Sequence, residues 1–356
     1  MSKTKNQKKI LHIITDKELS GAGQHMLTLF SANDPTFAQQ VLLPTESKLE
    51  HLLKQKKISY VTYSPQKSET KAIKQAIRKA SPDIIHTHSL LGRIAARKAG
   101  RFKRIHTQQE VEPAGFFTRL IAKKLSHAVI ATSMTTRNNL TQTGTPAAAI
   151  RMIYNGAPPV KEYSQNERIN LRKKLQIPEK TFVVLCTAKL TNAYEHILDT
   201  AKEMPYNVYV LIAGDDGGYK ANILARVKEE NLQNVKLYGT NEIDELFAVS
   251  DIQINLSLAN EPIPAPILSG MSVGKPTIST TIDSHIINYD TNGIIITLDE
   301  LGNLEYSEAL DEAITRLKDD QTLHKKLSEG AKTLYNKRFT AKQMVTDIQN
   351  IYKELM

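Results

Sequence analysis

Short apolar runs alternate with amphipathic helical segments along most of the chain. In the first half, the strand candidates are ILHIIT (10–15), AQQVLLP, ISYVTY, PDIIHTH, RIHTQ (104–108) and HAVIATS (127–133). Basic helical stretches such as ETKAIKQAIRKA lie between them. Buried strands that alternate with helices predict an α/β fold with a doubly wound parallel sheet.

The second half repeats this rhythm after a polar, charged stretch. Its strand candidates are TFVVLCTAKL, NVYVLIAGDDG, NVKLYG, DIQINLS, PTIST and GIIITL. The last fifty residues are helical in pattern, with EALDEAITRL and MVTDIQNIYKEL apolar on one face. A chain of 356 residues is too long for one core of ordinary size. We therefore predict two Rossmann-like domains, 1–165 and 166–330, and a helical tail, 331–356.

Cysteine content and hydropathy predict a cytoplasmic protein. The single cysteine, Cys186, lies in the apolar run FVVLC, where packing is favoured over reactivity. One cysteine excludes a disulfide framework and fits a reducing compartment. No apolar run reaches the roughly 18 residues that a membrane span needs, and ILHII is too short for a signal peptide.

Charge is divided unevenly along the chain. Residues 1–160 carry 25 Lys and Arg against 9 Asp and Glu, whereas the remainder carries 22 against 28. A basic first half predicts an anionic partner. Nucleic acid is disfavoured, because the chain has no Trp, is only 6% aromatic and does not interleave aromatic with basic residues. A membrane surface fits better. The segment FFTRLIAKKL (116–125) combines apolar with basic residues and could rest on a lipid surface, but its pattern is equally that of an ordinary sheet-flanking helix.

Ligands collect at the carboxyl ends of parallel strands, so the candidate residues are those that follow the strand runs. Gly21-Ala22-Gly23 either brings backbone close to a phosphate or only turns the chain into a helix. His86 and His88 form an H-x-H pair that suggests a metal. No cysteine or carboxylate with ligand spacing accompanies the pair, so packed or hydrogen-bonded histidines are favoured. His106 ends the next strand and is the better candidate for a ligand-facing side chain.

The second half has its own candidates at strand ends. Lys189 follows a strand and could meet a diphosphate as a point charge. The loop AGDDGG, with Gly214 and Asp215, either turns under a nucleotide or is a plain strand-ending turn. EPIPAPILSGMSVGKP (261–276) places one acid, Glu261, before a proline-stiffened loop that includes Pro264 and Ala265.

The order of these motifs resembles glycosyltransferase family 4, the retaining enzymes of the GT-B fold. The resemblance rests on SGAGQH, PDIIHTHS, IHT, SHAVIATS, IYNG, AKL, LIAGDDG, VKLYG, LANEP and MSVGKP, and spans nearly the whole chain. It implies two Rossmann-like domains facing across a cleft, the first binding the acceptor and the second a nucleotide sugar. It also implies a C-terminal helix that returns to the first domain, and a reaction that needs no metal or other cofactor.

The resemblance assigns roles to particular residues. Gly21 matches the glycine loop near the donor phosphate, and His106 matches the histidine near the reacting sugar. Glu261 matches the first acid of the family's E-x7-E motif, which holds a sugar hydroxyl. The roles of His106 and Glu261 are therefore expected to be catalytic.

The donor site departs from the family pattern at four points. The second acid of E-x7-E falls on Ser269, and the usual Phe-Gly appears as Ile263-Pro264, where proline lacks an N–H. Lys189 replaces an arginine and loses its bidentate fork. Tyr194 replaces a lysine and cannot neutralise a diphosphate.

Two functions stay open at this stage. The first is a retaining hexosyltransferase-type enzyme that moves a sugar to a lipid-linked or cell-surface glycan acceptor, peripheral at the inner face of the membrane. The second is a catalytically degenerate scaffold or binding subunit that works beside an active partner glycosyltransferase.

Overall fold

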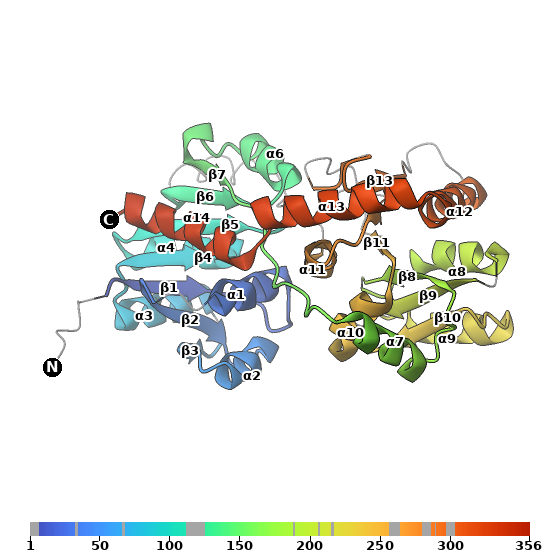
Figure 1. Cartoon of the computed structure of the whole chain (residues 1–356). Helices are drawn as coiled ribbons and strands as arrows, with labels where there is room; N and C mark the ends of the chain where they lie inside the picture. The colour runs from blue at the N-terminus through green and yellow to red at the C-terminus, as the bar shows by residue number, and fades with distance from the viewer. Residues whose placement is uncertain are drawn as a thin grey trace. The chain divides into compact units, whose positions relative to one another are not determined.

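The computed structural model describes most of the chain. The described residues are 7–32, 35–65, 68–111, 125–187, 189–205, 207–214, 217–255, 264–279, 286–288, 290–296 and 303–356. They form two compact units (Figure 1). Unit 1 comprises residues 1–156 and 341–356, and unit 2 comprises residues 157–340. These boundaries differ from those predicted from the sequence, which follow residues 165 and 330.

Unit 1 contains a parallel sheet with helices between its strands. Its described strands are β1 (Lys9–Ile13), β2 (Ala38–Pro44), β3 (Tyr60–Tyr63), β4 (Ile84–Thr87), β5 (Lys103–Gln108), β6 (Ala128–Ala131) and β7 (Ile150–Met152). Its described helices are α1 (Gly21–Ser31), α2 (Lys48–Gln55), α3 (Glu69–Ala80), α4 (Leu90–Ala99), α6 (Met134–Gln142), the 3-10 helix η1 (Ala147–Ala149) and α14 (Ala341–Glu354).

The described strands of unit 1 are ordered β3-β2-β1-β4-β5-β6-β7 and all neighbours are parallel. The chain first builds outward from β1 to β3 and then crosses back to β4. The order therefore reverses between β1 and β4, and such a switch point opens a crevice at the carboxyl ends of the two strands.

Unit 2 repeats the plan. Its described strands are β8 (Phe182–Cys186), β9 (Val208–Ala213), β10 (Val235–Tyr238), β11 (Ile252–Asn255), β12 (Thr277–Ser279) and β13 (Gly293–Ile295). They form a parallel sheet in the order β10-β9-β8-β11-β12-β13. Its described helices are α7 (Gln165–Lys174), α8 (Tyr194–Glu203), α9 (Lys220–Glu229), the 3-10 helix η2 (Thr240–Glu242), α10 (Ile243–Val249), α11 (Ala265–Ser272), α12 (Asn303–Asp319) and α13 (Gln321–Arg338). The predicted pair of parallel-sheet α/β domains is confirmed.

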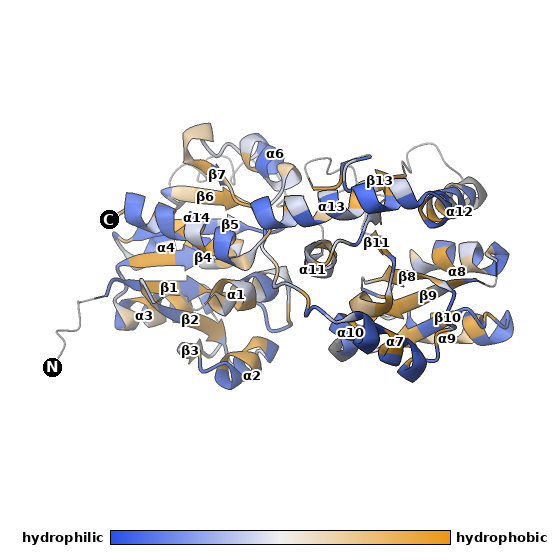
Figure 2. Cartoon of the chain, in the orientation of Figure 1, coloured by the Kyte–Doolittle hydropathy of each residue, from blue (hydrophilic) through white to orange (hydrophobic). Residues whose placement is uncertain are grey.

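The core of unit 1 recruits a helix from the far end of the chain. One face of α14 places Met344, Val345, Ile348, Ile351 and Tyr352 in the same hydrophobic cluster as β1, β2 and α1 residues. Figure 2 shows hydrophilic and hydrophobic residues interspersed along α14. Burial of such side chains, at roughly 1.5–3 kcal/mol each, holds this terminal helix on unit 1.

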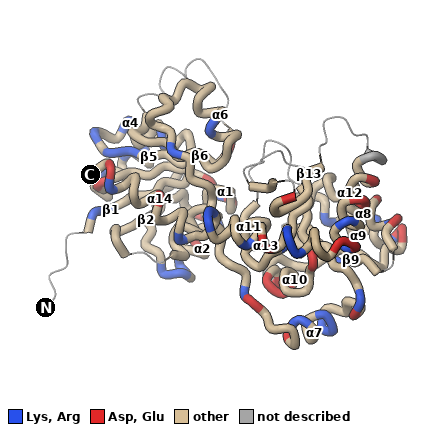
Figure 3. Tube along the Cα trace, turned by 45° about the horizontal axis from the view of Figure 1, so that its top comes forward, with Lys and Arg blue, Asp and Glu red and all other residues tan. Residues whose placement is uncertain are grey.

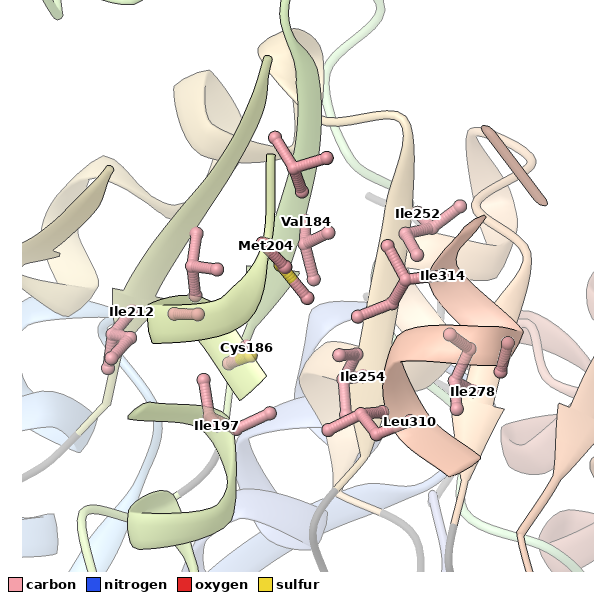
Figure 4. Packing of buried hydrophobic residues seen from close by; sticks show 14 of the residues in the cluster. Val184, Cys186, Ile197, Met204, Ile212, Ile252, Ile254, Ile278, Leu310 and Ile314 are labelled. Carbon is pink, nitrogen blue, oxygen red and sulfur yellow. The ribbon is translucent and has the colours of Figure 1, made fainter. Parts of the chain in front are cut away.

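The sheet of unit 2 is packed on both faces, and the larger of its two described hydrophobic clusters lies between the strands and α12. Val184, Cys186 and Ile254 from the strands meet Leu310 and Ile314 from α12 (Figure 4). Burial raises the pKa of the Cys186 thiol, so this cysteine packs as a small apolar residue. Among the described residues, none of the helices combines the length and the apolar character that a membrane crossing requires.

Candidate active site

The switch point of unit 1 gathers polar side chains from distant parts of the sequence. Parallel pairing sets His12 of β1 opposite His86 of β4, and Thr87 opposite His106 of β5. The carboxyl ends of three adjacent strands thus supply histidines to one edge of the sheet. All three of these histidines are buried.

His106 is held in one orientation by Thr87. Its Nδ1 lies 3.0 Å from the Thr87 carbonyl oxygen and 3.0 Å from the Thr87 hydroxyl oxygen. That hydroxyl donates to the Ile105 carbonyl at 3.2 Å, so both Thr87 oxygens act as acceptors toward the ring. Nδ1 therefore carries the proton and Nε2 carries the lone pair. This tautomer leaves Nε2 able to accept a hydrogen bond or a proton.

The two glycines of the α1 loop have different surroundings. A Cβ added at Gly21 would meet nothing within 4 Å, and Gly21 is exposed. A Cβ at Gly23 would lie 2.9 Å from Leu19 Cδ1, so close packing accounts for Gly23. Ala22 between them is buried. Packing therefore gives no reason for glycine at position 21, whereas close approach by a ligand would.

Three hydrogen-bonded residues beside this loop were not predicted from the sequence. His25 Nδ1 lies 2.9 Å from Asn155 Oδ1, and Asn155 Nδ2 donates to Gln109 Oε1 at 2.9 Å. The group links α1 to the IYNG segment and to the end of β5. His25 follows the glycine loop directly and Asn155 lies in a motif already noted, so only their contact was invisible in sequence.

Four further histidines of unit 1, His12, His25, His86 and His88, are buried. His86 Nδ1 lies 2.7 Å from the Tyr352 hydroxyl of α14, and its Nε2 lies 2.7 Å from Thr107 Oγ1. These contacts agree with the favoured packed role for His86. Burial lowers the pKa of His12 and His25 to about 4, and lowers the pKa of His86 and His88 well below the usual value. All four imidazoles are therefore neutral at neutral pH.

In unit 2, two of the predicted donor segments are neighbours. A Cβ at Gly217 would lie 2.3 Å from the Leu190 carbonyl oxygen and 3.0 Å from Lys189 Cγ. Only glycine lets the loop after β9 approach the loop after β8 so closely. Lys189 is exposed and Gly214 is half-buried. A role for Gly217 could not be predicted from the sequence, because only this contact between the two loops requires glycine at position 217.

Helix α11 begins with few backbone donors. Pro264 is its N-cap residue, without a side-chain capping bond, and a further proline follows Ala265 in the first turn. Prolines lack the N–H groups that make a helix N-terminus bind anions. The Ser269 hydroxyl donates to the Pro158 carbonyl at 2.9 Å, so it serves a contact within unit 2.

Three predicted residues need separate mention. Tyr194 opens α8 with no exposed surface, inside the hydrophobic core of unit 2, so it presents no surface to a ligand in this conformation. Glu261 and Asp215 lie outside the described residues. The segment 116–124, part of the predicted membrane-facing helix, does so as well.

Comparison with protein families matches both halves of the chain. Residues 19–160 match the family model "Glycosyltransferase Family 4", and residues 167–334 match "Glycosyl transferases group 1". The first matched segment contains β2 to β7 of unit 1, and the second contains β8 to β13 of unit 2. Both halves of the chain are thus similar to glycosyltransferases.

Individual relatives support this class. The chain is 27% identical over 214 residues to an O-antigen biosynthesis glycosyltransferase, WclY, of Escherichia coli, covering 59% of this chain and 57% of that protein. It is 24% identical over 315 residues to the E. coli UDP-Gal:alpha-D-GlcNAc-diphosphoundecaprenol alpha-1,3-galactosyltransferase, covering 79% and 77%. The match to the O-antigen enzyme therefore spans little more than half of that relative.

A solved structure matches the whole fold. Anabaena Alr3699/HepE, crystallised with UDP and glucose, superposes with a TM-score of 0.83 at 20% identity, covering 98% of this chain and 100% of that one. Together with the two parallel-sheet units, this likeness establishes the GT-B fold.

Proposed function

We propose that the protein transfers a sugar from a nucleotide-sugar donor to a cell-surface glycan or lipid-linked acceptor, with retention of anomeric configuration. The observation that carries the proposal is that each parallel-sheet unit matches its own glycosyltransferase family model. The relatives named above act, by their names, in O-antigen synthesis or on a diphosphoundecaprenol-linked sugar, which favours an acceptor of that kind.

Unit 2 would bind the donor. The adjoining loops at Lys189 and Gly217 place a cation beside a tight backbone turn, which suits the leaving diphosphate. UDP is the first nucleotide to test, because the Anabaena structure contains UDP and the galactosyltransferase is named for UDP-Gal. Glu261 would hold a hydroxyl of the donor sugar, as the family resemblance implies.

Unit 1 would bind the acceptor and provide His106. With its proton on Nδ1, His106 can accept a hydrogen bond at Nε2 from a sugar hydroxyl and so orient it. In a retaining reaction, the departing phosphate oxygen takes the acceptor proton on the same face of the donor sugar. No metal enters this scheme: Lys189 and backbone donors would stabilise the charge that develops on the diphosphate.

A second candidate is a scaffold or binding subunit that works beside a partner glycosyltransferase. The start of α11 favours it, because Pro264 and the proline after Ala265 remove two backbone donors where the resemblance expects a diphosphate contact. Tyr194, which aligns with a lysine of the family, is neutral and also buried, so it supplies no cation beside Lys189. Cytoplasmic location and contact with an anionic membrane surface through the basic unit 1 belong to either candidate.

Calorimetric titration of UDP-sugars into the full chain tests the donor site. We expect one nucleotide sugar to bind with 1:1 stoichiometry, Glu261→Ala to weaken it at least tenfold, and the exposed control Glu179→Ala to leave it unchanged. If no UDP-sugar binds at ligand concentrations above about 1 mM, the upper end of typical donor KM values, the proposed donor site is wrong.

Transfer assays then separate the two candidates. An enzyme releases UDP when a diphosphate-lipid-linked sugar is added, and NMR of the product reports retention. Tight donor binding without transfer to any acceptor would instead support the scaffold.

A further inference from the structure

Four buried histidines of unit 1 lie in ring contact near the switch point. The ring centroids of His86 and His88 are 4.4 Å apart, those of His12 and His86 5.2 Å, and those of His25 and His88 5.6 Å. We call these four residues the histidine cluster. None of them was needed for the transfer scheme above.

Three members of the cluster meet the geometry of a metal site. His12, His86 and His88 each offer a ring nitrogen, and these nitrogens all lie within 4.8 Å of one another. The sequence offered only the H-x-H pair His86 and His88, with no third ligand at a recognisable spacing. The register between β1 and β4 supplies that ligand, since it sets His12 beside His86.

The closest pair already has the separation of two ligands on one ion. His12 Nδ1 and His88 Nε2 are 3.4 Å apart, longer than the usual 2.9–3.0 Å of a hydrogen bond from nitrogen. Zinc–nitrogen bonds of about 2.0–2.1 Å in a tetrahedron put two nitrogen ligands about 3.3–3.4 Å apart. The third nitrogen would need to move inward by at most about 1.4 Å to complete the site.

Two of the three rings, His12 and His86, have hydrogen-bond partners outside the cluster, whereas His88 Nδ1 has none among the described residues. His12 Nε2 lies 2.9 Å from Gln39 Oε1, which can only accept, so the lone pair of His12 lies on Nδ1. Both ring nitrogens of His86 contact a hydroxyl, Nδ1 that of Tyr352 and Nε2 that of Thr107. An ion bound to this ring would take the place of the Thr107 hydroxyl at Nε2, while the Tyr352 hydroxyl keeps its contact with Nδ1. Oriented outer partners of this kind are typical of metal-binding histidines.

Two nitrogens of the cluster have no hydrogen-bond partner among the described residues. They are His88 Nδ1 and His25 Nε2. His25 Nδ1 faces the Asn155 oxygen, so the unpartnered Nε2 carries a lone pair. A buried lone pair without a donor costs about 1–3 kcal/mol, and an added electrophile would relieve this cost. The neutral state of the four rings is also the state that binds metal.

We propose that His12, His86 and His88 bind one divalent transition-metal ion of the Zn²⁺ and Co²⁺ class, with His25 or water as a fourth ligand. The imidazole-only set selects these ions over Mg²⁺ and Ca²⁺, which prefer oxygen. Bound there, the ion would tie β1 to β4 and, through His86 and Tyr352, brace α14. It takes no part in the proposed transfer step.

The test uses the full chain without a polyhistidine tag, titrated with Zn²⁺ and, separately, with Co²⁺. We expect one equivalent of Zn²⁺ to bind and Co²⁺ to give the intense visible bands of a four-coordinate nitrogen site. His12→Gln and His88→Gln should weaken Zn²⁺ binding at least tenfold, whereas the exposed control His51→Gln should not change it. Circular dichroism confirms that each variant is folded.

The outcomes are distinguishable. Absence of stoichiometric Zn²⁺ binding, or equal binding by wild type and both cluster variants, overturns the site. If a cluster variant fails to fold, the wild-type Co²⁺ spectrum decides alone, because a six-coordinate aqua-like spectrum contradicts a three-histidine site. UDP-sugar binding is measured in parallel, so failure of the metal site and failure of the donor site give different results.

Discussion

The two sheets have the same parallel design but differ in what they bury near their ligand edges. Unit 1 buries four neutral histidines around the switch point between β1 and β4. Unit 2 has no histidine among its described residues there: it buries Thr187, Asn255 and Ser279 at the ends of β8, β11 and β12, and leaves Lys189 exposed. Figure 3 adds that acidic segments are concentrated on unit 2, in line with its net negative charge.

The contrast fits the two roles proposed above for the units. A buried, hydrogen-bonded histidine has a fixed tautomer and orientation, which suits aligning an acceptor hydroxyl. An exposed lysine has a flexible side chain whose point charge can reach a diphosphate in more than one position. Helix α11 of unit 2 begins with prolines, which reduces the number of backbone donors at its N-terminus.

Replacement of His106 in unit 1 should change activity more than any other substitution proposed for this protein. His106→Asn should lower turnover by about 10²–10⁴-fold, the usual contribution of a positioned acid–base or orienting group. Affinity for the UDP-sugar should change little, since His106 belongs to unit 1. Steady-state kinetics and calorimetry on the same preparation measure both quantities. An equal loss of donor affinity would contradict the assignment of His106 to the acceptor side.

The next effect compares one glycine from each unit. Gly217→Ala should lower the free energy of unfolding by about 1–3 kcal/mol, because its Cβ would clash with the Leu190 carbonyl oxygen. Gly21→Ala should leave stability within about 0.5 kcal/mol, since its Cβ meets open space, yet should weaken turnover. Denaturant unfolding and kinetics of both variants provide the check. If Gly21→Ala changes neither stability nor activity, the α1 loop is only a turn.

The last prediction concerns the pH dependence of stability that the buried lysine of unit 2 produces. Lys275 is almost fully buried just before β12, and burial, followed by nearby Arg168, lowers its pKa from 10.5 to about 7, with Asp251 opposing. Its ammonium donates to the Ser250 carbonyl. Between pH 7 and 10 the unfolded chain binds a proton that the folded chain does not. Stability should therefore rise with pH over this window, by at most about 1.4 kcal/mol per pH unit.

Lys275→Met should remove that slope, because methionine fills a similar volume without a titrating group. Lys332→Met, which replaces a neighbouring lysine whose side chain is 48% exposed, is the matched control and should retain it. Urea unfolding at several pH values gives the slopes. Parallel curves for wild type and Lys275→Met would show that Lys275 keeps an ordinary pKa in the folded chain.

Much of the fold could be predicted from residue order alone. The apolar runs located the strands, and the ETKAIKQAIRKA pattern coincides with helix α3 at Glu69–Ala80. Strand–helix alternation is a local signal, and it determines a parallel sheet because such connections have one stable geometry. The same order of motifs led to the glycosyltransferase class before any contact was known.

The site was only partly predictable. His106 and Gly21 could be selected because they follow strands, and position along the chain suffices for that. The fixed tautomer of His106, the link from His25 to Asn155, and the close approach at Gly217 depend on contacts between segments far apart in sequence. No local pattern encodes such contacts.

The histidine cluster shows the division most clearly. The sequence determined that His86 and His88 end a buried strand, and by the same local evidence it favoured a packed role without metal. Only the tertiary structure set His12 beside them, because the register of β1 against β4 is decided by the burial of both strands together. Likewise, the apolar face of α14 was visible in sequence, whereas its place in unit 1 followed from where that face could be buried.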